Sequence, residues 1–176
     1  DELETCLREL PQALVGEIGV DELKEPVSPG QHDLFAAQLE IATAYRRPVI
    51  VHAAKAFAAL TEHETALKKV KFSHHGFVKN RELLKFINKC GGYIGLGALF
   101  LKQEKAAEMW AMMPQDRILF ETDAPYRVDE TKYNEAVQEN LRRLAEIAGE
   151  EPEALAERLI KNAEDFLRTD NLRTDK

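Results

Sequence analysis

Pro48-Val49-Ile50-Val51-His52 is an unbroken apolar run that ends on a histidine. Continuous apolar runs of this length are typical of strands that are buried on both faces of a parallel sheet. One helical pattern precedes the run, over residues 28–45, and another follows it, over residues 54–67. A buried strand between two helices predicts a βα unit, so the sequence indicates an α/β fold.

The same alternation continues in both directions from this unit. We predict strands over residues 13–19, 48–52, 70–75, 93–97 and 117–121, and helices over residues 28–45, 54–67, 81–89, 102–112, 134–148 and 152–167. In the first helix the apolar residues Leu34, Leu39, Ala42 and Tyr45 recur at helical spacing and predict its buried face. Repeated strand–helix units predict a parallel sheet, and the pattern leaves open whether that sheet is open or closed into a barrel.

The composition is that of an ordinary globular protein. The chain has 176 residues, of which 44% are hydrophobic and 31% charged, and its formal net charge is −7. This length predicts a single domain with a sizeable core. The acidic balance argues against broad neutralisation of nucleic-acid phosphates, although a phosphate ester held by metal ions stays compatible with it. Two cysteines are too few for a disulfide framework, and no apolar run is long enough for a membrane helix, so we predict a cytoplasmic protein.

Four polar residues stand at or just beyond the ends of apolar strands. They are Glu17, His52, His75 and Asp123, and the intervals between them correspond to one, one and two βα units. In parallel α/β folds the carboxyl ends of the strands lie at one end of the sheet, where ligands and catalytic groups gather. Imidazole nitrogens and carboxylate oxygens are suitable ligands for zinc, manganese and related ions. The spacing therefore predicts a metal site.

Other interpretations exist for each residue taken singly. A lone histidine at a strand end is commonly a hydrogen-bonded structural residue, and Asp123, two residues before Pro125, has the character of a turn residue. It is the coincidence of four such residues that favours the metal site. His74 and His75 cannot both point into that site, because neighbouring residues on a strand face opposite ways. The spacing does not choose between them.

Several segments resemble motifs of the TatD family of metal-dependent hydrolases. The matching segments, in the family's order, are Gly16-Glu17-Ile18-Gly19-Val20-Asp21, His75-Gly76-Phe77, Gly92-Tyr93-Ile94-Gly95-Leu96-Gly97 and Leu119-Phe120-Glu121-Thr122-Asp123-Ala124-Pro125-Tyr126. The last is similar to the family signature L-x-E-T-D-A-P-Y nearly letter for letter. The resemblance extends from about residue 13 to about residue 167, and it favours His75 over His74.

The resemblance implies a TIM-type (β/α) barrel with two divalent metal ions, either Mg, Mn or Zn, that hydrolyses phosphodiester bonds as a deoxyribonuclease. By this resemblance Glu17 bridges the two metals, and His52 and His75 complete the site of one of them. Asp123 binds the other metal and helps to activate the attacking water, so Glu17 and Asp123 are the expected catalytic residues. The expected substrate is DNA or a small phosphoester, and no membrane partner is implied.

One family element is missing from the sequence. The first strand of the family carries an H-x-H pair, and no H-x-H occurs in these 176 residues. Five strands are recognisable, whereas a closed barrel has eight. We therefore expect residues 1–176, which begin with Asp1 rather than methionine, to be one domain that forms strands four to eight of the barrel. The missing strands would be supplied by upstream residues or by another chain, and the activity of this chain alone is left open.

Substrate recognition departs from the family pattern. Lys55 follows His52 where the family usually has an arginine, and Arg127 lies in a shorter loop than many members have; both are weak candidates for substrate binding. These departures motivate one alternative function, and the missing H-x-H pair motivates another. The chain is either a related barrel hydrolase that acts on a small ester, lactone or amide, or a truncated, impaired paralogue that serves as a binding module.

Overall fold

A single parallel sheet organises the chain. The computed structural model describes residues 2–23, 28–126 and 128–168. Its five strands pair in chain order, each parallel to the next, as the α/β prediction required. They are β1 (Val15–Asp21), β2 (Val49–Ala54), β3 (Phe72–His74), β4 (Tyr93–Leu96) and β5 (Ile118–Phe120). Because all five run the same way, their carboxyl ends lie together at one end of the sheet.

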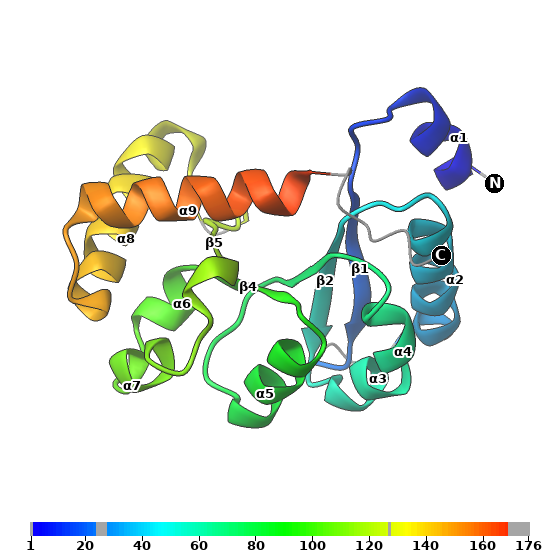
Figure 1. The fold of residues 1–176 in the computed structure, drawn as a ribbon, viewed down its shortest axis with the longest axis horizontal. Helices are drawn as coiled ribbons and strands as arrows, with labels where there is room; N and C mark the ends of the chain where they lie inside the picture. Colours follow the sequence, from blue (N-terminus) through cyan, green and yellow to red (C-terminus); the bar gives the residue numbers. More distant parts are fainter. Residues whose placement is uncertain (1, 24–27, 127, 169–176) are drawn as a thin grey trace.

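Helices connect the strands and follow the last one. They are α1 (Glu2–Glu9), α2 (Gln31–Ala44), α3 (Phe57–Glu62), α4 (Glu64–Leu67), α5 (Arg81–Lys89), α6 (Ala98–Leu101), α7 (Ala106–Trp110), α8 (Tyr133–Ala148) and α9 (Pro152–Leu167), with 3₁₀ turns η1 (Gln115–Arg117) and η2 (Glu130–Lys132). Figure 1 shows α2 beside β1 at one end of the molecule and α6, α7 and α8 at the other. Helix α9 packs on α8 and on β5, which secures the last strand.

The pleat of the strands separates a packed face from a more open one. Val49, Val51, Phe72 and Ile94 are almost completely buried and lie at alternate positions or in register across β2, β3 and β4. Ile50 points the other way and is only half-buried, so β2 is not covered on both faces as its apolar sequence predicted. The less covered face carries His52 and leads to the cavity described below.

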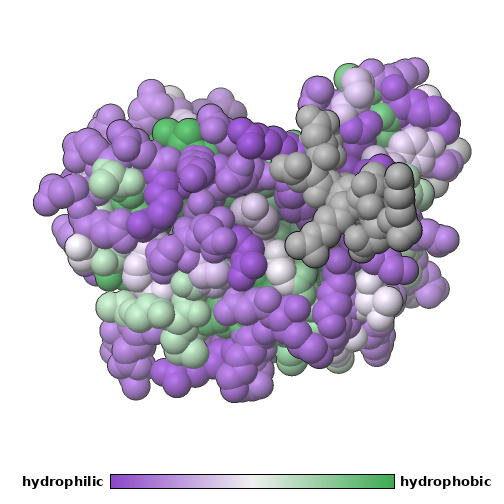
Figure 2. Space-filling view, in the orientation of Figure 1, coloured by the Kyte–Doolittle hydropathy of each residue, from purple (hydrophilic) through white to green (hydrophobic). Residues whose placement is uncertain are grey.

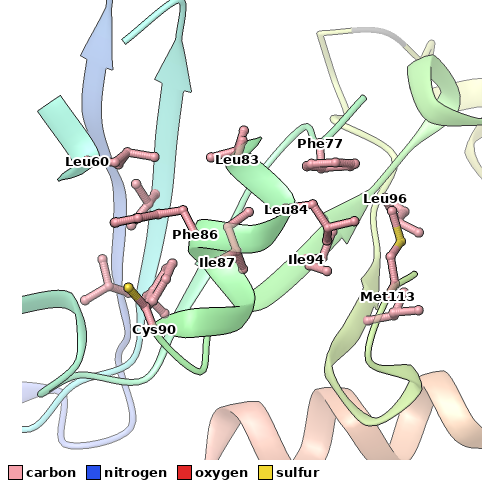
Figure 3. Close-up of a cluster of buried hydrophobic side chains, with 14 of the residues drawn as sticks. Leu60, Phe77, Leu83, Leu84, Phe86, Ile87, Cys90, Ile94, Leu96 and Met113 are labelled. Atoms are coloured by element: carbon pink, nitrogen blue, oxygen red, sulfur yellow. The ribbon is translucent and has the colours of Figure 1, made fainter. Parts of the chain in front are cut away.

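Helix α5 shows how sequence signals place a helix against this sheet. It begins after Asn80, whose side chain accepts hydrogen bonds from the backbone N–H groups of Glu82 and Leu83. It ends before Gly91, which adopts a positive φ of 72°. An asparagine N-cap and a glycine with positive φ after the last turn are common features of the two ends of a helix. Its apolar face, made by Leu83, Leu84, Phe86 and Ile87, points into the buried cluster of Figure 3 together with Leu60, Phe77, Ile94 and Leu96.

Two predicted helices differ in extent from those in the structure. The helix predicted over residues 54–67 is α3 followed by α4, because β2 extends to Ala54 and His63 leaves helical geometry at φ −101° and ψ 17°. The Thr61 hydroxyl donates to the Ala58 carbonyl just before this break, in competition with the helical backbone. The helix predicted over residues 102–112 is only α7 in the structure, and the separate helix α6 ends before the predicted range begins.

Two further details differ from the sequence prediction. Leu39 and Ala42 are buried as predicted, whereas Leu34 is 58% exposed and the neighbouring Phe35 takes its place on the inner face of α2. Helix α1 was not predicted. It buries Leu7 against the main core.

The surface is largely polar. Figure 2 shows a mostly hydrophilic face, with apolar residues gathered over the end that carries α6 and α7 in Figure 1. Leu99 and Met112 are among the exposed apolar side chains of this region of the chain. Within the described residues no helix has the length and apolar character needed to cross a membrane. Cys6 is exposed, Cys90 is buried, and both are free thiols.

Candidate metal centre

Three of the sequence-predicted ligands converge at the carboxyl ends of the strands. Glu17 comes from β1, His52 from β2, and His75 from the residue that follows β3. One potential ligand atom from each of the three lies within 4.8 Å of the other two. The convergence follows from topology: β1, β2 and β3 are adjacent and parallel, so residues at corresponding heights face one another.

The distances between these groups suit a shared cation. His75 Nε2 is 3.7 Å from Glu17 Oε1, and His52 Nδ1 is 3.8 Å from Glu17 Oε2. These separations are too long for hydrogen bonds. They are close to the roughly 3.4 Å expected between two atoms that each bind one divalent ion at about 2.1 Å in tetrahedral geometry. Two imidazoles and a carboxylate also form a nitrogen and oxygen donor set that zinc and manganese accept.

Asp123 reaches the same group from β5, the far edge of the sheet. Its Oδ1 atom lies 3.6 Å from His75 Nε2. The Asp123 backbone has a positive φ of 60°, which aspartate tolerates better than most residues. The structure thus brings together all four residues that the sequence singled out.

Two more carboxylates belong to this neighbourhood and were not assigned to the site from sequence. Asp21, at the end of β1, has its Oδ2 atom 3.8 Å from His52 Nε2. Gln31 holds the Asp21 backbone through hydrogen bonds to its N–H and carbonyl groups. Glu121 lies with Oε2 3.0 Å from His75 Nδ1. Both residues stand inside the quoted motifs, and their strand-end positions were the available signal.

The carboxylates around His75 change its protonation. The hydrogen bond that His75 donates to Glu121 is the largest cause that raises the pKa of His75 to about 9, and the charges of Glu121, Glu17 and Asp123 add to it. Burial of the ring acts in the opposite direction. Without a metal the ring is therefore a cation at neutral pH, which is the expected state of an imidazole surrounded by anions.

The backbones of β1 and β2 approach each other closely beside the site, at Gly19 and His52. Gly19 pairs with His52 in the register of the two strands and has a φ of 148°. A Cβ atom at Gly19 would overlap the carbonyl oxygen of His52. Only glycine therefore allows the two backbones to lie this close.

The site opens into a cavity of about 520 Å³. Its walls include the acidic and imidazole groups described above and the apolar side chains of Leu23, Phe77, Leu99 and Tyr126. Among the predicted substrate-binding residues, Lys55 is exposed and is not one of the described residues that line this cavity, although its neighbours Ala53 and Ala54 are. The prediction for Arg127 lies outside the described residues.

The structure separates the two adjacent histidines. His75 faces Glu17, whereas His74 is 3% exposed and packs edge-on against Phe77. Burial is the largest cause that lowers the pKa of His74 to about 4, so its ring is neutral at physiological pH. The alternation of side chains along β3 accounts for these opposite environments.

We expect His74 to make the fold sensitive to acid. The pKa of His74 is about 4 in the folded protein, below its ordinary value of 6.5. The contribution of the neutral, buried ring to the free energy of unfolding is therefore complete above pH 6.5. It is lost as the pH falls towards 4, because the unfolded chain takes up the proton first. The loss amounts to about 3 kcal/mol, since each pKa unit corresponds to about 1.4 kcal/mol. Urea unfolding should show that His74→Leu loses less stability than the wild type between pH 6.5 and 4.5. A matching pH dependence in both proteins would contradict this, and His32→Gln, at a largely exposed site, is the control.

The sequence model of the family described as TatD related DNase matches residues 1–168. The chain belongs to the TatD family. Its curated TatD relatives include the 3'-5' ssDNA/RNA exonuclease TatD of Erwinia billingiae (strain Eb661), which is 31% identical over 92% of the chain and 68% of the relative. The protein of the same name from Edwardsiella piscicida is 31% identical over 71% of the chain and 50% of the relative.

A solved structure supports the TatD assignment. The crystal structure of YjjV, a TatD homologue from Escherichia coli K12, matches with a TM-score of 0.80 and 25% identity over 94% of the chain and 68% of YjjV. The chain therefore spans between half and about two thirds of the length of these TatD relatives. The sequence motifs and the match to a solved structure thus both indicate the TatD family.

Proposed function

We propose that this chain is part of a TatD-type hydrolase that cleaves phosphodiester bonds in DNA with a water molecule activated by two divalent metal ions. The observation that carries the proposal is the convergence of Glu17, His52 and His75, with ligand atoms within 4.8 Å of one another. The position of Asp123, 3.6 Å from His75, adds a second carboxylate on the cavity side.

Each residue has a distinct role in this proposal. Glu17 would hold both metals, as the family resemblance implies, and its carboxylate lies 3.8 Å from His52 Nδ1 and 3.7 Å from His75 Nε2. His52 and His75 would complete the site of one metal, and Asp123 would bind the other and accept the proton of the attacking water. A bound metal pair lowers the pKa of that water and offsets negative charge on the phosphoryl oxygens.

We also propose that residues 1–176 form one domain that corresponds to strands four to eight of an eight-stranded barrel. The five-stranded parallel sheet and the 68% coverage of YjjV support this assignment. The remaining three strands, with the H-x-H pair of the family, would be contributed by upstream residues or by another chain. Those two histidines would complete the metal site that Asp123 shares.

Support for a nucleic-acid substrate comes from the relatives and from the cavity. The relatives from Erwinia and Edwardsiella are named as exonucleases of single-stranded DNA and RNA. Leu23, Leu99 and Tyr126 present exposed apolar surface at the cavity beside the carboxylates. Apolar and aromatic surfaces next to a metal centre suit a base whose adjoining phosphate is being cleaved.

The lining of the cavity also favours a second candidate function. The described residues that line it include no lysine or arginine. A neutral small ester, lactone or amide needs no such cation, whereas phosphodiesters are commonly held by one. This observation favours a related barrel hydrolase with a small substrate as the alternative.

A direct assay separates the two functions. The protein is incubated with a labelled single-stranded oligonucleotide and, in parallel, with a panel of esters, lactones and amides, with Mg²⁺, with Mn²⁺ and with a chelator. We expect nucleotide release that requires metal and stops with the chelator. Turnover of the small substrates without nucleotide release would replace the nuclease assignment by the alternative.

Tyr126 should contribute to substrate binding. Its side chain is 79% exposed and lines the cavity, as a base-stacking platform would. Stacking on an aromatic ring contributes about 1–3 kcal/mol per base, so Tyr126→Ala should raise KM for an oligonucleotide roughly 10-fold with a smaller change in kcat. Tyr126→Phe keeps the ring and should behave like the wild type. Equal KM values for the alanine variant and the wild type would count against a base at this position.

A further inference from the structure

We propose that Glu121 is a positioning residue that fixes the orientation and the tautomer of His75. This inference rests on the metal centre proposed above and adds a residue to it. Glu121 comes just after β5 and does not face the ion-binding side of the imidazole. It contacts the opposite ring nitrogen, Nδ1, at 3.0 Å, while Nε2 faces Glu17 and Asp123.

Both oxygens of Glu121 are engaged, which holds the carboxylate in place. Oε1 accepts a hydrogen bond of 2.7 Å from the backbone N–H of Gly76, and Oε2 meets His75 Nδ1. The side chains of Glu121 and His75 are 21% and 14% exposed, so water competes weakly for these contacts. A carboxylate that uses its second oxygen on a backbone group next to the histidine has little freedom to turn away.

The contact between Glu121 and His75 needs free space above β4. β4 lies between β3 and β5, so the Glu121 side chain has to pass over β4 to reach His75. The Glu121 side chain passes above Gly95, where an added Cβ atom would overlap its Oε2 atom. Gly97 is also close, with its added Cβ 3.4 Å from Glu121 Cγ. The glycine-rich strand thus leaves the space that the carboxylate occupies.

The consequence for His75 follows from hydrogen-bond chemistry. An ionised carboxylate only accepts hydrogen bonds, so the neutral ring must keep its hydrogen on Nδ1. The lone pair is then on Nε2, directed towards Glu17 and Asp123, where a metal ion would bind. In Glu121→Gln one amide oxygen would still accept from Gly76, and the amide NH₂ would face Nδ1. That donor would leave the hydrogen on Nε2 and block the ligand position.

Two variants test the inference through the same contact. Glu121→Gln changes the chemistry of the group, whereas Gly95→Ala displaces the carboxylate and keeps its charge. We expect each to weaken Mn²⁺ binding, measured by calorimetry, by roughly 10- to 100-fold, as loss of an outer-shell partner does. Glu22→Gln is the charge control, because Glu22 follows β1 and pairs with His32 at 3.5 Å. It should stay within about twofold of the wild type.

A second readout reports the tautomer itself. Two-bond ¹H–¹⁵N spectra of the metal-free protein, recorded at a pH where the His75 ring is neutral, should place the hydrogen on Nδ1 in the wild type and on Nε2 in Glu121→Gln. Circular dichroism confirms that the variants are folded. Folded Glu121→Gln and Gly95→Ala proteins with wild-type Mn²⁺ affinity and an unchanged tautomer would overturn the inference and leave the metal centre standing. A wild-type protein that binds no Mn²⁺ would overturn the metal centre and this inference with it.

Discussion

Replacing Glu17 by glutamine is expected to abolish tight binding of divalent metal and, with it, nucleotide release. Glu17 has an oxygen near each imidazole, at 3.8 Å from His52 and 3.7 Å from His75. An amide keeps the shape but loses the charge that offsets the cations, and its NH₂ group repels them. The loss should exceed the roughly 100-fold effect of removing an outer-shell partner. Metal content per chain and calorimetric titration with Mn²⁺ measure it.

Asp123→Asn should give a different pattern. Asp123 lies 3.6 Å from His75 Nε2, the nitrogen that also faces Glu17, and is proposed to accept the proton of the attacking water. The variant should therefore keep much of its affinity for the ion held by His52 and His75 while kcat falls by orders of magnitude. Glu108→Gln, on an exposed part of α7, is the matched control for loss of one charge. Wild-type activity in both Glu17→Gln and Asp123→Asn would refute the assigned roles.

Gly19→Ala is expected to disrupt both stability and the site. The added Cβ would overlap the carbonyl oxygen of His52. Both atoms are attached directly to the backbones of paired strands, so no side-chain rotation can relieve the overlap. The variant must separate β1 from β2 or distort the positive φ of 148°. We expect a loss of about 3–5 kcal/mol in the free energy of unfolding, measured with urea, at the large end of single-residue effects. Mn²⁺ affinity should fall as well, because Glu17 moves with β1.

Gly149 supplies the control for this substitution. It ends α8 with a φ of 69°, and an added Cβ would meet nothing within 4 Å. Gly149→Ala therefore carries the strain of a positive φ without a clash, at about 1–2 kcal/mol. If Gly19→Ala destabilised the protein no more than Gly149→Ala, the close approach of the two strands would not be the reason for the glycine.

The sequence was most informative where physical constraints are local or periodic. Helix α9 matches its predicted bounds, and α8 begins one residue before them, because long amphipathic patterns with a proline at the start or a glycine at the end leave few alternatives. The meeting of Glu17, His52 and His75 was also predictable. Parallel strands bring their carboxyl ends together whatever the loops between them do.

Other features depended on tertiary contacts that no pattern shows. Glu121 was counted as the last residue of a strand, and its contact with His75 depends on a gap over β4 that only the packed sheet reveals. The division of α3 from α4 at His63 is not visible in the sequence either, because the stretch around His63 has acceptable helix propensity. Lys55 was selected for its charge, yet the turn after β2 leaves it away from the cavity lining.

The alternation along β3 makes the chemistry of this protein depend on an exact residue count. Deleting one residue within the strand would exchange the surroundings of His74 and His75, sending a neutral, packed ring to the carboxylates and a cationic one into the core. Insertions between α6 and α7, at residues 102–105, have no such effect on strand register. The connections can therefore lengthen without changing this alternation, whereas the strands that position Glu17, His52 and His75 must keep their length.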